Sequence, residues 1–142
     1  MKYKPLLNIL LASVLIGCDP GSEFRKTVQN DSQKDIWIIW YEKTTVGGAQ
    51  FKALDSVLVK AGTAQGMFHG SGTTGGYWTN KDCANPLNID SLGAKIANDE
   101  QHKLNKDINN NSLWRYSQSG SNAKGYKMQC LFQINQSDII QK

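Results

Sequence analysis

Two histidines are the side chains of this chain that ordinarily change charge near neutral pH. His69 and His102 are therefore the candidates for general acid–base chemistry, each working with a nearby serine and aspartate as in a small hydrolase. No GxSxG motif supplies a nucleophile at a strained strand-to-helix turn. The other interpretation places both histidines on the surface at strand ends. We favour that interpretation, and we expect a protein that is not an enzyme and has no catalytic residue.

A glycine-rich stretch runs from Gly70 to Gly76 and ends on Tyr77 and Trp78. It lacks the Gly-Lys-Ser/Thr ending of a P-loop, and it does not open a helix with a GxGxxG pattern. The histidines and cysteines of the chain also share no metal-ligand spacing. The stretch is therefore expected to be a loop whose glycines let the backbone turn, and we predict neither a cofactor nor a metal site.

The first seventeen residues have the organisation of a secretory signal. Two lysines lie within the first five residues, and residues 6–17 are nearly all apolar, a stretch too short to span a bilayer stably. The stretch ends in Leu15-Ile16-Gly17-Cys18. This sequence resembles the lipobox of bacterial lipoproteins at all four positions. The resemblance implies that signal peptidase II cuts after Gly17, that the Cys18 thiol carries a diacylglycerol, and that the new amino group receives a further acyl chain such as palmitate.

That resemblance divides the chain into a signal peptide at 1–17, a lipidated tether at 18–24 and one domain at 25–142. The expected location is the bacterial cell envelope, on the inner or the outer membrane, with the domain outside the cytoplasm. Asp19 favours the inner membrane in enteric bacteria, but other bacteria use other sorting signals. Loss of Lys2 and Lys4 leaves fourteen basic and twelve acidic residues, and a net charge of +2 without basic clusters argues against nucleic acid as a partner.

The remaining cysteines, Cys83 and Cys130, form the one pair available for a disulfide in an oxidising compartment. The alternative is two free thiols, one in a loop and one buried in a strand. We predict the disulfide.

Aromatic residues at the ends of loops suggest binding rather than catalysis. Tyr77, Trp78 and Trp114 lie beside loops rich in glycine or asparagine, and a flat ring offers contact area to a protein or glycan at little entropic cost. We predict a binding edge formed by these three residues, with core packing as the alternative. Lysozyme-inhibitor lipoproteins are comparable in size, but their SGxxY-type loop is not reproduced, because Tyr77 follows Ser71-Gly72 only after four residues.

Short runs of β-branched and aromatic residues between turn signals predict strands at 24–29, 35–42, 55–60, 64–69, 92–97, 114–118 and 125–134. In the strongest run Ile36 and Ile38 face one way and Trp37 and Ile39 the other, so either both faces are covered or one is left for a partner. Residues 98–108 suit either a strand or a short helix. This pattern predicts an all-β fold, a small antiparallel sandwich that is Ig-like or barrel-like.

Three short segments carry a further resemblance: Asn30-Asp31-Ser32, Asp55-Ser56-Val57-Leu58-Val59 and Asp90-Ser91-Leu92. With these segments the domain resembles small β-sandwich lipoproteins of bacterial envelopes. The resemblance covers about half of the domain and implies no activity. The sequence therefore predicts a membrane-anchored, non-catalytic interaction module, with a lysozyme-inhibitor-like protein or a small hydrolase as the alternatives.

Overall fold

The structure is a computed structural model that describes residues 21–44, 50–72, 83, 90–121 and 124–142. These residues form strands and two short 3-10 turns. The strands are β1 (Ser22–Asn30), β2 (Ile36–Thr44), β3 (Gln50–Val59), β4 (Thr63–Gly72), β5 (Ser91–Ile96), β6 (His102–Leu104), β7 (Trp114–Ser121), β8 (Gly125–Ile134) and β9 (Ile139–Gln141). The turns are η2 (Asn111–Leu113) and η3 (Gln136–Asp138).

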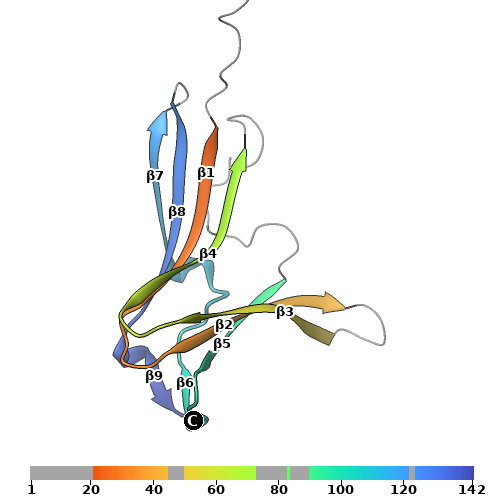
Figure 1. Cartoon of the computed structure of the whole chain (residues 1–142), viewed down its shortest axis with the longest axis vertical. Coiled ribbons are helices and arrows are strands. Elements are labelled where there is room, and N and C mark those ends of the chain that lie inside the picture. The colour runs from red at the N-terminus through yellow and green to blue at the C-terminus, as the bar shows by residue number, and fades with distance from the viewer. Residues whose placement is uncertain (1–20, 45–49, 73–82, 84–89, 122–123) are drawn as a thin grey trace, which may run out of the picture.

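The strands form three sheets, and the predicted all-β class is confirmed. The first sheet has the order β4-β1-β8-β7, the second β3-β2-β5, and the third pairs β6 with β9 (Figure 1). All the pairs are antiparallel except β1 with β8, which is parallel. The sequence predicted a small antiparallel sandwich and did not indicate this one parallel pair. The difference arises because most of the chain separates β1 from β8, so no hairpin turn dictates their relative direction.

The inward sides of the first two sheets share one hydrophobic core. In β1 alternate residues from Ser22 to Asn30 are buried, and in β8 alternate residues from Met128 to Ile134 are buried opposite them. The second sheet contributes Ile36, Ile38 and Val59, which are fully buried. This period of two is the strand period, because successive side chains point to opposite faces of a sheet.

Asn30 organises the corner where the first sheet passes into the second. Its side chain is fully buried, and its amide nitrogen donates to the carbonyl oxygens of Lys34 at 2.8 Å and Val59 at 3.0 Å. Its amide oxygen accepts hydrogen bonds from the backbone N–H of Ser32 at 3.1 Å and from the Ser32 hydroxyl at 2.7 Å. A buried amide is tolerated when its donors and acceptor are paired, and here the pairing fixes the turn between β1 and β2.

The two faces of β2 differ in burial, and the alternation in the sequence placed Ile36 and Ile38 on one face and Trp37 on the other, as the structure has them. Ile36 and Ile38 lie in the core, whereas Trp37 on the opposite face is 37% exposed. Ile39 and Tyr41, which share that face with Trp37, are half-buried. The Tyr41 ring covers Gly93 of β5, where an added Cβ would lie 2.7 Å from the ring. The second face of β2 is therefore only partly covered.

Residues 98–108 contain the short strand β6 and no helix, which decides between the two alternatives for this segment. The strand pairs with β9, where His102 lies opposite Gln141 and Leu104 opposite Ile139. The sequence did not predict β9, because three residues at the end of the chain carry too short a pattern to indicate a strand.

The domain begins earlier than the predicted boundary at residue 25. β1 starts at Ser22, and the side chains of Ser22 and Phe24 are each only 3% exposed. Residues 22–24 therefore belong to the domain and not to the tether. Figure 1 shows the start of β1 at one end of the long axis and the C-terminus at the other.

Candidate functional sites

Cys83 and Cys130, which are 47 positions apart in the sequence, form the disulfide that the sequence predicted. Both are buried, and Cys130 lies on the core side of β8 opposite Lys26 of β1. The Lys26 side chain is 2% exposed, and its ammonium group donates to the Cys83 carbonyl oxygen at 2.8 Å. The same group lies 4.1 Å from the centre of the Trp114 ring, an arrangement that favours a buried cation.

Trp114 is part of the core, which was the alternative left open for it. It is 5% exposed, and its ring centre lies 5.1 Å from the ring centre of Phe132. Its indole N–H donates to the Ile108 carbonyl oxygen at 2.8 Å. The predicted binding edge therefore does not include Trp114, because its ring surface is covered by protein. Tyr77, Trp78 and the acylation candidate Cys18 lie outside the described residues.

His69 lies on the exposed face of β4, opposite Arg25 of β1. Within the part of the chain that the structure describes, no hydroxyl or carboxylate hydrogen-bonds its ring. Its position does not assemble a Ser-His-Asp arrangement.

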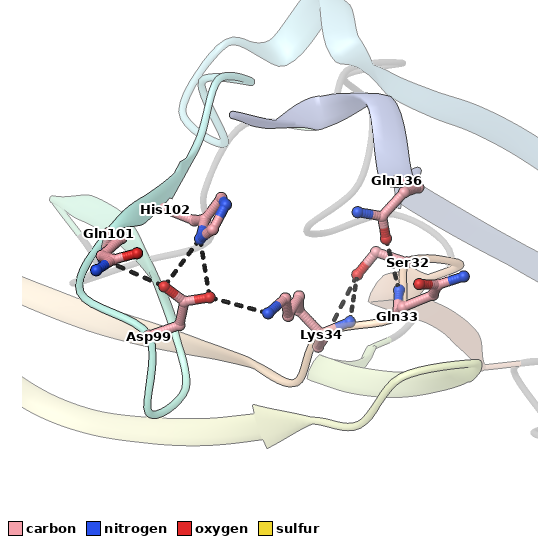
Figure 2. Close-up of polar contacts among 7 residues, drawn as sticks. All are labelled: Ser32, Gln33, Lys34, Asp99, Gln101, His102 and Gln136. Carbon is pink, nitrogen blue, oxygen red and sulfur yellow. Dashed lines mark hydrogen bonds and ion pairs between the residues drawn. The ribbon is translucent and has the colours of Figure 1, made fainter. Parts of the chain in front are cut away.

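His102 does meet an aspartate. Its Nδ1 lies 2.9 Å from both carboxylate oxygens of Asp99, and the Lys34 ammonium group lies 3.0 Å from one of them (Figure 2). The same carboxylate accepts a hydrogen bond from the backbone N–H of Gln101 at 3.1 Å. Figure 2 places Ser32 beyond Lys34, away from the histidine, and the Ser32 hydroxyl donates to Asn30 instead. The cluster thus joins two turns, and it contains no serine beside His102.

The pKa of the Asp99 carboxyl is held far below its usual range, first by the His102 hydrogen bond and then by that from Lys34. A carboxyl whose pKa is lowered in the folded state stabilises the fold at pH values above its pKa in the unfolded state. That stabilisation is lost as the pH falls toward the pKa in the folded state. Asp99→Asn should therefore lower the free energy of unfolding most above about pH 5, with a difference from wild type that shrinks as the pH approaches about 2. Urea denaturation between these pH values measures the difference.

Glu100→Gln is the matched control, since it removes the same charge from the adjacent, exposed position. Because Glu100→Gln keeps Asp99 and its hydrogen-bond partners, its stability should follow that of wild type over the same pH range. A difference between wild type and Asp99→Asn that stays constant over the whole range would contradict the assignment.

The outer face of the first sheet carries polar side chains in rows that cross three strands. One row contains Ser117 of β7, Gln129 of β8 and Arg25 of β1, which lie opposite one another. The next row contains Ser119, Lys127 and Glu23 in the same order of strands. We call these six residues the Arg25 face. Neighbouring strands are about 4.8 Å apart, so the charged and hydrogen-bonding groups of these six residues lie close together on the sheet.

Short side chains beside long ones leave a hollow of about 350 Å³ on this surface, and all six residues of the Arg25 face line it. A second hollow of about 480 Å³ adjoins Arg25 on its other side, between β1 and β4. Gly66, opposite Thr27, adds no side chain there, and a Cβ at this position would meet no atom within 4 Å. The bulged pairing of β1 with β4 at this point adds Met67 as an extra residue.

Positive charge dominates the Arg25 face. Arg25 and Lys127 are cationic, and Glu23 is the one acidic side chain among the six residues. The Arg25 guanidinium lies 3.5 Å from the Glu23 carboxylate, and both side chains are well exposed, at 61% and 40%. An exposed pair of this length contributes little to stability. Lys127 lies opposite Glu23 in the sheet register, yet these two described residues form no ion pair.

The sequence analysis missed this face. Its signal was the alternation of polar residues within β1 and β8, which indicates an exposed face without showing which strands are neighbours. The described residues contain no group of three or more metal-ligating side chains and no helix long and apolar enough to cross a membrane. Comparison with protein-family models, curated proteins and solved structures finds no match to this chain.

Proposed function

We propose that this protein is a bacterial envelope lipoprotein, held on a membrane through acylated Cys18, whose β domain acts as a non-catalytic binding module. The lipobox-like sequence Leu15-Ile16-Gly17-Cys18 supports the anchor. The observation that supports binding is the Arg25 face, where charged, amide and hydroxyl side chains line a hollow on a sheet. Loops and side chains carried by a rigid β scaffold are suited to recognition, because little ordering is needed when the partner binds.

The position of the two histidines favours this role over a hydrolase. His102 meets Asp99 without a serine beside it, and the carboxylate is shared with Lys34. His69 meets neither a serine nor an aspartate among the described residues. Acid–base catalysis by a serine hydrolase requires the nucleophile and base to be within hydrogen-bond reach, so the described residues offer no such centre.

The binding function predicts that a photo-crosslinking amino acid in place of Gln129 captures a specific partner in living cells. Gln129 is exposed and lines the hollow, so a bound partner would lie against it. The matched control is the same amino acid in place of Lys103, which is exposed on β6, a strand of a different sheet. A discrete conjugate from position 129 that is absent from position 103 is the expected result. Equal patterns from the two positions would contradict the proposal.

A further inference from the structure

We infer that the Arg25 face binds an anionic saccharide, with an acidic group of the sugar on Arg25 and Lys127 and the sugar hydroxyls on Ser117, Ser119 and Gln129. This inference rests on the proposed binding function and names the ligand class for the same surface. It follows from the charge of the face, from the kind of groups that surround the charges, and from the position of the face within the sheet.

The charge of the Arg25 face favours an anionic ligand. Two cations and one carboxylate line the first hollow, and His69 lines the adjoining hollow with Arg25. The ion pair of Arg25 with Glu23 is long and exposed, so an incoming anion does not have to displace a strong internal partner. The guanidinium group matches the geometry of a carboxylate or phosphate, with which it forms two parallel hydrogen bonds.

The uncharged groups favour a sugar over a simple anion. Serine hydroxyls both donate and accept, and the Gln129 amide offers a donor and an acceptor on one side chain. Such groups pair with the hydroxyl or acetamido groups that a saccharide presents at short intervals. Ser117 and Ser119 of β7 lie beside Gln129 and Lys127 of β8, and Arg25 lies on β1 at the other side of β8. Hydroxyl, amide and cationic groups therefore share one face of the sheet.

The sheet position argues against an extended peptide as the ligand. Peptides that join a sheet pair their main chain with an edge strand. β1 and β8 are interior strands of the order β4-β1-β8-β7, so their backbone groups are already paired on both sides. Recognition over β1 and β8 must therefore use side chains, as it does for a ligand rich in hydroxyl groups, whereas β7, which carries Ser117 and Ser119, is an edge strand.

The anchor places the face close to a membrane. Glu23 lies five positions after Cys18 in the sequence, and an extended chain of that length spans at most about 18 Å. An acidic saccharide near the envelope membrane, free or carried by a lipid, would therefore lie within reach of the face.

The test measures binding by the full-length protein, purified from its host, to acidic trisaccharides made of mannuronate, guluronate or galacturonate. Wild type should bind at least one of them and should bind neutral mannotriose much more weakly, and rising salt should weaken the binding because exposed charges are screened. Arg25→Gln should lower the affinity roughly ten- to hundredfold, which corresponds to the loss of a charge-assisted hydrogen-bonded pair. Arg115→Gln is the matched control, because Arg115 lies on β7 of the same sheet and lines neither hollow, so its loss should leave the affinity unchanged.

Three results would overturn the inference: equal affinity of Arg25→Gln and wild type, equal binding of acidic and neutral trisaccharides, or binding only of phosphatidylglycerol vesicles or inorganic phosphate. An error in the ligand class can be distinguished from an error in the proposed binding function. If no acidic trisaccharide binds but the conjugate from position 129 still forms in cells, the ligand class is wrong and the binding function stands. If the conjugate is also absent, both are wrong.

Discussion

Cys18→Ala should abolish acylation of the protein and leave its precursor uncleaved by signal peptidase II. In cells fed a clickable fatty acid, wild type should carry the label, and the variant should carry none. The physical reason is that the thiol of this residue is the group to which the lipid is attached in a lipobox-type sequence. The effect is complete and not graded, because no other residue of Leu15-Ile16-Gly17-Cys18 offers a thiol.

Without acyl chains, the uncleaved Cys18→Ala precursor should be held at the membrane only by its short apolar segment, and therefore more weakly than wild type. Each buried methylene of an acyl chain contributes about 0.8 kcal/mol, so several chains hold a protein far more firmly than one reversible myristoyl group. Cys83→Ala is the matched control, because its sulfur is bonded to Cys130 and its loss should leave the label on Cys18. Normal labelling of Cys18→Ala would show that the anchor is elsewhere or absent.

Removal of the disulfide should give the largest loss of stability from any change in the described domain. In the chain-entropy model, cross-linking cysteines 47 residues apart stabilises the fold by about 4 kcal/mol. The double variant Cys83→Ala/Cys130→Ala should therefore lose about that much and should melt roughly 15 °C lower, as expected for a domain of this size. Urea denaturation and thermal melting measure the two quantities.

Reduction of wild type provides the companion measurement, since it breaks the bond without removing the sulfur atoms. Dithiothreitol should destabilise wild type by a similar amount and should have no effect on the double variant. Cys130 is fully buried, so the double variant should also show the cost of a small cavity, and it should be slightly less stable than reduced wild type. Equal stability of oxidised wild type and the double variant would contradict a stabilising role for the bond.

Much of the fold could be predicted because strands leave a local pattern in the sequence. The alternation in residues 125–134 and the run from Ile36 to Tyr41 identify β8 and β2 without knowledge of any partner strand. The disulfide could be predicted because two cysteines remain once Cys18 is assigned to the lipid. These inferences need only local pattern and counting.

Pairing between distant strands could not be predicted. The parallel contact of β1 with β8 joins residues about a hundred positions apart, and nothing in the sequence of either strand identifies the other as its partner. Trp114 gave the same difficulty, because an aromatic residue after a polar loop suits a binding edge as well as a core. Its burial depends on Phe132 and Ile108, which approach it only in the folded chain.

The candidate site was missed for the same reason. Arg25 lies far from Ser119 and Lys127 in the sequence, and each of the three by itself is an ordinary exposed strand residue. They become one surface only through the register of β1, β8 and β7. The histidines, by contrast, were singled out by residue type, and the structure places them in separate surroundings, one beside Arg25 and one beside Asp99.

The central claim is that the outer face of the four-stranded sheet is where this protein binds its partner. The most direct test is crosslinking from position 129 in living cells, repeated with Ser117→Tyr. This substitution fills the hollow from an exposed position, and tyrosine suits a strand, so the fold should be retained. The account predicts a conjugate in the parent protein that disappears in Ser117→Tyr and in Arg25→Gln but remains in Arg115→Gln. A conjugate of unchanged yield in all of these proteins would contradict it.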